Sequence, residues 1–223
     1  MYTDYMLMTA AKNVTRDVSL VFDFIERPYS PVRFKELLVS PNEMKQKFIR
    51  LINEEIKNKQ AGKPAYILIK INHITDPVMV KKLYEASSHG VRIDLLVRGN
   101  CSLITGVPGV SDTIRINGII DRYLEHSRIF IFANGGDEKM FIGSADWMPR
   151  NLDNRVEVIA PVYDPEIKAD LKRVVEYGLK DTLQGRVVDG TGENRPWISE
   201  DKTAFRSQEE LYKYYLNENR IKD

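Results

Sequence analysis

One segment constrains the fold of this chain more than any other: two apolar runs separated by a helical pattern. Residues 65–71 (AYILIKI) and 91–97 (VRIDLLV) are typical of buried strands. Between them, Asp76-Pro77 predicts a helix start, the helix continues to Ala86, and Gly90 ends it. A strand, a helix and a strand within about 33 residues favour a right-handed crossover between parallel strands. We therefore expect an α/β protein.

Further elements are expected on both sides of this unit. Apolar spacing predicts additional helices over 14–25, starting near Thr15-Arg16-Asp17, and over 42–57, 165–183 and 208–215. Apolar runs predict additional strands over 6–8, 113–119, 128–132, 140–143 and 156–160. Residues 134–137 are interpreted as a turn, 26–34 as a linker and 185–205 as a loop.

Composition excludes several classes of protein. The 33 basic and 32 acidic residues give a net charge of +1, which argues against a polybasic nucleic-acid binder. The single cysteine, Cys101, has no partner for an internal disulfide and favours a reducing compartment. No apolar run reaches the ~18–20 residues of a membrane span, and no signal-peptide pattern is visible. We expect a cytoplasmic protein.

A group of residues suited to phosphate follows the strand–helix–strand unit. His126 precedes a strand by two positions and shares a face with Arg128, because extended chain alternates its side chains. Ser144, Arg155 and Glu157 follow. Arginine forks bind phosphate oxygens, and a carboxylate such as Glu157 could fix the tautomer of His126. A surface histidine in a salt-bridge network is the alternative, and spacing alone leaves both interpretations open.

Strand ends supply further candidates. Lys70 and Asn72 alternate on one strand face, with His73 behind them, and Arg98 follows the next strand. Open α/β sheets bind ligands at the carboxyl ends of their strands. Solvated or structural roles are the alternative for each residue. His89 is interpreted as a helix C-cap. The three histidines show no metal-ligand spacing, and neither a Walker loop nor G-x-G-x-x-G is present.

Two levels of resemblance emerge from these residues. The strings His126-Ser127-Arg128 and Gly143-Ser144-Ala145-Asp146, followed by Glu157, resemble the H-x-K, G-S-x-N and E pattern of the phospholipase D superfamily. Longer strings resemble bacterial polyphosphate kinases of the first type, over roughly residues 1–185. These strings are YTDY at 2–5, VFDFIE at 21–26, LLVRG at 95–99, DRYLEH at 121–126, NGGD at 134–137, SADWM at 144–148, RN at 150–151 and RVEV at 155–158.

This resemblance implies a fold and a reaction. The fold would be a phospholipase D-like α/β sandwich with a mixed sheet and flanking helices. The reaction would be reversible transfer of the terminal phosphate of ATP to inorganic polyphosphate through a phosphohistidine. That histidine would lie upstream, so the chain would be a carboxy-terminal fragment, inactive alone. Residues 1–37 would be the end of a preceding domain plus a linker, 38–185 a second domain, and 186–223 a tail with a short helix.

The resemblance also implies roles for single residues. His126 and Glu157 would be catalytic, and Asp4 and Asp146 would orient them. The ATP phosphates would meet Tyr2, Arg98, His126 and Arg155, and further phosphate contacts would come from Lys70, Asn72, Arg128 and Ser144.

The same resemblance implies partners. ATP or ADP would be a substrate together with polyphosphate. Mg²⁺ would be held mainly by the nucleotide and upstream residues, with no metal ligand in this chain. No nucleic acid is expected. Peripheral membrane association is compatible with the sequence, and the full-length enzyme is expected to be a homo-oligomer.

Three departures from the phospholipase D pattern disfavour a simple phosphodiesterase. Arg128 replaces its lysine, Ala133 its aspartate and Asp146 its asparagine. Two alternatives nevertheless stay open: a phospholipase D-like phosphodiesterase or nuclease that pairs two His126 sites in a dimer, and an anion-binding module without turnover.

Overall fold

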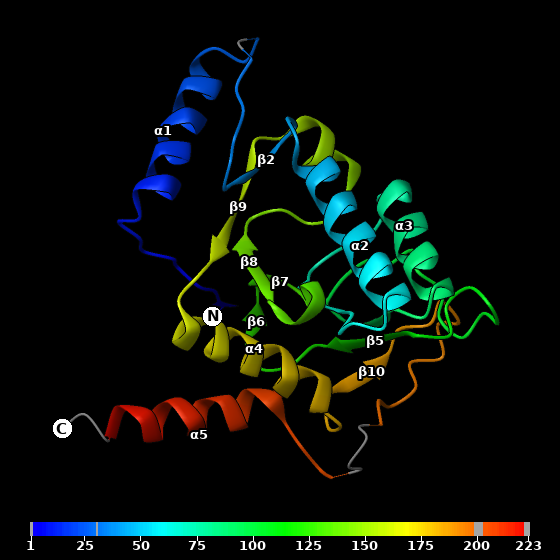
Figure 1. The fold of residues 1–223 in the computed structure, drawn as a ribbon. Helices are drawn as coiled ribbons and strands as arrows, with labels where there is room; N and C mark the ends of the chain where they lie inside the picture. The colour runs from blue at the N-terminus through cyan, green and yellow to red at the C-terminus, as the bar shows by residue number, and fades with distance from the viewer. Residues whose placement is uncertain (1, 30, 199–202, 221–223) are drawn as a thin grey trace.

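A mixed eight-stranded sheet forms the centre of the molecule (Figure 1). The computed structural model describes residues 2–29, 31–198 and 203–220, apart from the side chains of Tyr2, Thr3, Asn219 and Arg220. The strand order is β10-β5-β4-β3-β7-β8-β9-β2. Helices cover both faces, so the expected α/β sandwich with a mixed sheet is confirmed.

The strand–helix–strand unit forms as predicted. Strands β3 (Tyr66–Ile71) and β4 (Arg92–Val97) are parallel, and α3 (Pro77–Ser88) joins them. The Asp76 carboxylate caps α3 by accepting the backbone N–H groups of Val78 and Met79, each at 3.0 Å. Strand β5 (Ile114–Ile119) extends the parallel part of the sheet beyond β4.

The other half of the sheet is antiparallel. Strands β7 (Arg128–Phe132), β8 (Lys139–Gly143) and β9 (Glu157–Val162) follow one another beside β3, and β2 (Leu38–Ser40) pairs with β9. A 3₁₀ turn, η1 (Asn134–Gly136), joins β7 to β8. At the opposite edge, β10 (Gly185–Val187) pairs antiparallel with β5. This arrangement brings the ends of many strands to one side of the sheet.

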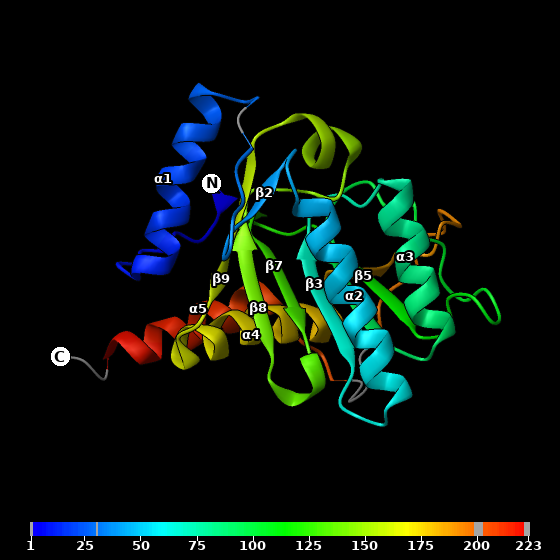
Figure 2. The same cartoon turned by 45° about the horizontal axis from the view of Figure 1, so that its top comes forward.

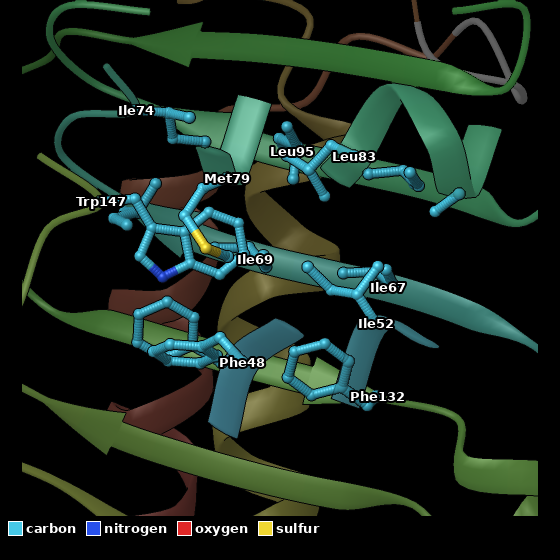
Figure 3. Close-up of a cluster of buried hydrophobic side chains, with 14 of the residues drawn as sticks. Phe48, Ile52, Ile67, Ile69, Ile74, Met79, Leu83, Leu95, Phe132 and Trp147 are labelled. Atoms are coloured by element: carbon cyan, nitrogen blue, oxygen red, sulfur yellow. The ribbon is translucent and has the colours of Figure 1, made fainter. Parts of the chain in front are cut away.

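Side-chain alternation along the strands separates two cores. Ile67, Ile69 and Ile71 of β3 face α2 (Met44–Gln60) and α3, whereas Leu68 faces α4 (Pro165–Lys180). Figure 2 shows these helices on opposite faces of the sheet, with α5 (Ser207–Arg220) beside α4. In the larger core, Figure 3 shows Phe48 beside Trp147, and their ring centroids are 5.1 Å apart.

The amino-terminal helix α1 (Lys12–Glu26) lies near the β9–β2 edge (Figure 2). Its Val14, Val21 and Phe24 form a third apolar cluster with the segment leading into β2. The helix begins at Lys12 rather than near Thr15-Arg16-Asp17. Asp17 is buried because its carboxylate accepts the backbone N–H groups of Glu36 and Leu37.

Several other expectations about elements are wrong. No strand forms over 6–8, where Met6 and Met8 are 87% and 85% exposed. Instead β1 (Tyr2–Thr3) pairs in parallel with β6 (Leu124–Glu125) in a separate sheet. The region 185–205 contains β10 rather than only a loop. Strands of two or three residues are too short to show an apolar pattern. Among the described residues, no helix is long and apolar enough to cross a membrane.

Candidate functional site

The candidate site is a cavity of about 690 Å³ at one end of the sheet. Strands β3 and β4 end there, β7 begins there, β8 ends there and β9 begins there. Residues that just precede or follow these strands therefore converge. The cavity lining includes most of the predicted site residues: Asp4, Asn72, His73, Arg98, His126, Arg128, Ser144, Asp146, Arg155 and Glu157.

His126 lies between a carboxylate and a guanidinium group. Its Nδ1 is 3.2 Å from Asp4 Oδ2 and 3.0 Å from Arg128 Nη1. A neutral ring can accept from Arg128 at this nitrogen, and a protonated ring can donate to Asp4. Arg128 Nη1 also donates to the His126 carbonyl oxygen at 2.9 Å. The predicted shared face of His126 and Arg128 is present, and both protonation states of His126 find a partner.

Asp146 fixes Arg128 from the other side. Arg128 donates from Nε and Nη2 to the two carboxylate oxygens of Asp146, each at 3.2 Å. Asp146 Oδ1 also accepts the backbone N–H groups of Asn72 and His73, at 3.0 and 3.3 Å. A forked pair with additional backbone bonds holds a guanidinium group in one orientation. These hydrogen bonds connect the end of β3, the loop after β8 and His126.

Glu157 does not contact the His126 ring, contrary to one prediction. It accepts hydrogen bonds from Ser144 Oγ at 2.5 Å and Asn151 Nδ2 at 2.6 Å. The carboxylate at the His126 ring is that of Asp4. Glu157 starts β9 and therefore lies beside the loop after β8, which holds Ser144. Asp4 instead follows β1, and β1 pairs with β6, the strand just before His126. The prediction that Glu157 fixes the His126 tautomer is therefore corrected.

The carboxyl ends of β3 and β4 form another wall of the cavity. Arg98 Nε donates to Asn72 Oδ1 at 3.0 Å, and His73 Nδ1 accepts the backbone N–H of Asn100 at 2.9 Å. Gly99 lies against His73 so closely that a Cβ would be 2.3 Å from the ring. The Asn72 Nδ2 atom is buried and has no hydrogen-bond partner within the described residues. A ligand oxygen would satisfy it.

Two arginines give the cavity a solvent-facing positive wall. Arg150 and Arg155 line it, are exposed, and flank a π-helical turn, η2 (Arg150–Asn154). Asn151 in this turn is buried, and its Oδ1 has no hydrogen-bond partner in the described part of the chain. The sequence pattern and the family resemblance include Tyr5, Arg150 and Asn151 but assign none of them a role in the site. Arg150 and Asn151 are themselves one of the strings that carry the resemblance, which was the signal that could have selected them.

Lys70 is not in the cavity, contrary to prediction. It is 7% exposed, and its Nζ lies 2.9 Å from Glu125 Oε2. On β3 it follows the alternation that places Leu68 on the α4 side of the sheet. Burial by itself would raise the pKa of Glu125. The Lys70 charge and the hydrogen bonds from Lys70 and Gln208 outweigh burial and lower that pKa. Lys70 is therefore a structural cation.

Two other residues considered in the sequence, His89 and Tyr2, do not add to the described cavity. His89 is the C-cap residue of α3, and its Nδ1 lies 2.8 Å from the Glu85 carbonyl oxygen, as its interpretation as a cap requires. The side chain of Tyr2 lies outside the described residues. Within the described ranges, no group of three or more His, Cys, Asp or Glu side chains is placed to hold a metal ion.

Comparison with known protein sequences identifies close relatives. A family model described as polyphosphate kinase C-terminal domain 2 matches residues 37–208. A polyphosphate kinase of Escherichia coli strain K12 is 44% identical over 214 residues, which are 96% of this chain and 31% of that protein. One from Klebsiella pneumoniae is 46% identical, with the same coverage. The chain thus spans about a third of the length of the curated relatives it matches.

Solved structures agree with the sequence matches. The crystal structure of a polyphosphate kinase from Porphyromonas gingivalis superposes with a TM-score of 0.90 at 39% identity, covering 96% of this chain and 33% of that one. A phospholipase D family member, Nuc from Salmonella typhimurium, superposes with a TM-score of 0.50 at 14% identity, covering 70% of this chain and 97% of that one. The latter similarity concerns the fold alone.

Proposed function

This chain belongs to the polyphosphate kinase family, and from that premise we propose that it supplies one side of a phosphoryl-transfer site. The reaction is the reversible transfer of the terminal phosphate of ATP to inorganic polyphosphate. The phosphohistidine that carries the phosphoryl group lies, in this proposal, outside the part of the relatives that this chain matches. This chain contributes His126 and an arginine-lined wall, and it is inactive alone.

The arrangement around His126 carries the proposal. A phosphoryl group in flight needs in-line positioning and neutralisation of charge on its oxygens more than it needs covalent chemistry. The cavity offers three arginines for this purpose, Arg98, Arg150 and Arg155. The unpartnered Asn72 Nδ2 adds one neutral donor. We assign ATP phosphates to Tyr2, Arg98, His126 and Arg155, and further phosphate contacts to Asn72 and Ser144.

His126 acts as an acid or base in this proposal. Its Nδ1 lies between Asp4 and Arg128, so the ring has a hydrogen-bond partner before and after it gains a proton. Asp146 orients the ring indirectly through Arg128. Glu157 keeps a catalytic role by orienting Ser144 and Asn151 toward the phosphates rather than by contacting the histidine.

We propose the remaining assignments from the resemblance to polyphosphate kinases. Mg²⁺ enters bound to the nucleotide phosphates, since this ion retains its waters and binds proteins through few carboxylates. The whole enzyme is a cytoplasmic homo-oligomer, and peripheral association with a membrane is compatible with this placement. The division into 1–37, 38–185 and 186–223 stays a prediction.

The test uses a polyphosphate kinase that contains this chain, with His126→Ala against the wild type. Polyphosphate synthesis from ATP is expected to fall by ~10² or more, the usual size of an acid–base loss. His89→Ala is the matched control, because His89 caps a helix away from the cavity, and it should retain activity. Undiminished synthesis by His126→Ala would refute the proposal.

A second measurement uses this chain alone. Incubation with γ-labelled ATP should leave no acid-sensitive label on the protein, because none of its three histidines matches the phosphoacceptor. Stable labelling would contradict the proposed location of the phosphohistidine. Hydrolysis of a phosphodiester substrate by the chain, abolished by His126→Ala, would instead favour the phospholipase D-like alternative. Phosphate binding without turnover and independent of His126 would favour the anion-binding module.

A further inference from the structure

Asp4 and His126, whose side chains meet in the cavity, each follow a very short strand. Asp4 follows β1 and His126 follows β6, and these two strands have two residues each. They form a sheet of their own, outside the eight-stranded sheet. A pair of such short strands is not stable by itself in water. Something else must therefore set the 3.2 Å separation of the Asp4 and His126 side chains.

Helix α5 is hydrogen-bonded to the segment that leads to His126. Gln208 Oε1 accepts the backbone N–H of Tyr123 at 2.9 Å, and Gln208 Nε2 donates to the Tyr123 carbonyl oxygen at 2.8 Å. The same Nε2 donates to Glu125 Oε1 at 2.9 Å. One amide side chain thus pairs with both backbone groups of one residue, as a neighbouring strand would. Gln208 is 9% exposed, so these bonds are shielded from water.

Glu125 connects this segment to the eight-stranded sheet. Its second carboxylate oxygen lies 2.9 Å from Lys70 Nζ on β3, and both side chains are largely buried. The residue immediately before His126 is therefore fixed between α5 and the central sheet.

The same helix also holds the strand that leads to Asp4. Tyr215 of α5 lies with its hydroxyl oxygen 3.2 Å from that of Tyr5, the residue after Asp4. The Tyr215 hydroxyl donates to Asp170 of α4, whose two oxygens are each 3.0 Å away. Burial, first among the causes, raises the pKa of Tyr5 to about 12, so its hydroxyl stays protonated at neutral pH. Both strands of the small sheet thus depend on α5.

The start of α5 is itself anchored. Asp181, at the end of α4, accepts the backbone N–H and the hydroxyl of Ser207, both at 2.7 Å. One residue earlier, Arg206 donates from Nη2 and Nε to Asp121 at 2.6 and 2.9 Å. Figures 1 and 2 both show α5 lying along α4. The helix is therefore fixed to the body of the molecule at its first turn, which allows it to locate what it contacts.

We propose that Gln208 and Tyr215 are positioning residues for phosphoryl transfer: α5 sets the placement of the His126 ring relative to Asp4. Neither side chain lines the candidate site. This inference rests on the proposed function of His126. It gives the last helix of the chain a role in the reaction that its distance from the phosphate-binding wall would not suggest.

The kinetic test uses Gln208→Ala in a polyphosphate kinase that contains this chain. The expected kcat is roughly tenfold lower, because small misplacements of a catalytic group are costly, while the KM for ATP stays within about twofold. Tyr215→Phe keeps the ring, removes the hydroxyl and should lower kcat by about threefold in the same way. Lys213→Ala is the matched control on α5, since Lys213 pairs only with Glu210 of its own helix among the described contacts. It should be indistinguishable from the wild type.

A spectroscopic test separates positioning from a general loss of structure. In this chain, Gln208→Ala should shift the NMR signals of the His126 ring and speed hydrogen exchange at the Tyr123 amide. The His89 ring, bonded within α3, should be unchanged and reports on the remaining fold. Unchanged His126 signals together with wild-type kcat would overturn the inference, and so would signal changes of equal size at both histidines.

The two proposals fail in distinguishable ways. If His126→Ala abolishes synthesis and Gln208→Ala leaves kcat unchanged, only the role of α5 is refuted. If His126→Ala retains synthesis, the proposed function fails whatever Gln208→Ala does.

Discussion

Asp94 and Asp146 are both buried carboxylates that bind arginine side chains, one at each end of the sheet. Asp94 near the start of β4 accepts from Arg92 at 2.8 Å and from Arg115 at 2.6 Å. Those arginine side chains are 60% and 41% exposed, whereas that of Arg128, the partner of Asp146, is 10% exposed. Asp146 also receives two backbone N–H groups.

The difference lies in what the arginine touches next. The Arg92 and Arg115 side chains are largely exposed, and their pairs with Asp94 neutralise a buried charge. Arg128 continues to the ring and the carbonyl oxygen of His126. The same two residue types therefore make largely exposed ion pairs at one end of the sheet and, at the other, a buried pair that continues to His126. Arginine content alone does not distinguish them.

Removing one arginine at a time tests most directly whether the two carboxylate–arginine pairs differ in function. Arg128→Ala in a polyphosphate kinase that contains this chain is expected to reduce synthesis by ~10², since losing one preorganised charged donor has that size. Arg92→Ala should leave synthesis within about twofold, because its guanidinium is remote from the cavity and mostly hydrated. Equal losses in both variants would show that the two carboxylate–arginine pairs do not differ in function.

A smaller effect is expected where an arginine binds substrate rather than positioning the histidine. Arg98→Ala should raise the KM for ATP about tenfold, the equivalent of one charge-assisted hydrogen bond, with a smaller change in kcat. Arg115→Ala serves as the control on the next strand of the sheet, because Arg115 does not line the cavity. A loss confined to kcat in Arg98→Ala would place Arg98 with Arg128 instead.

The smallest effect concerns a third pair, Asp121 with Arg206, and it depends on pH. The hydrogen bond from Arg206 lowers the pKa of Asp121 below its usual 3.8. A lowered pKa of an acid adds stability above its unfolded value, and that stability is lost as pH falls through the folded value. Arg206→Gln should therefore lower Tm by roughly 2–4 °C at pH 7. The difference from the wild type should shrink as pH falls below 3.8 and through the lower pKa of folded Asp121. A difference of constant size across a titration into acid would exclude the Asp121 charge as its cause.

Long elements could be predicted from the sequence, and short ones could not. The runs 65–71 and 128–132 correspond to β3 and β7 because continuous apolar residues mark strands buried on both faces. Strands β2, β6 and β10 have two or three residues and are defined by their partners rather than by their own pattern. The strand expected over 6–8 failed for the opposite reason: an apolar string there has no partner in the sheet.

The site shows the same limit at the level of single residues. His126, Arg128 and Asp146 could be selected because a motif and a strand register place them together. Spacing along the chain suggested Glu157 as the ring's partner, whereas only the resemblance pointed to Asp4 as an orienting residue, because the pairing of β1 with β6 joins positions more than a hundred residues apart. The prediction for Lys70 failed although the strand alternation was right, because Glu125 binds the Lys70 ammonium group on that face of the sheet.

The close approach of Gly99 to His73 has a consequence for how this site can vary. A single added carbon at position 99 would overlap the imidazole, whereas one at Gly106 or Gly109 would meet open space. In a saturation library, substitutions at position 99 should thus be disfavoured, and those that are tolerated should displace the His73 ring. At this point the wall of the cavity can take up added bulk only if the His73 ring moves, so position 99 ties the shape of the cavity to the place of one imidazole.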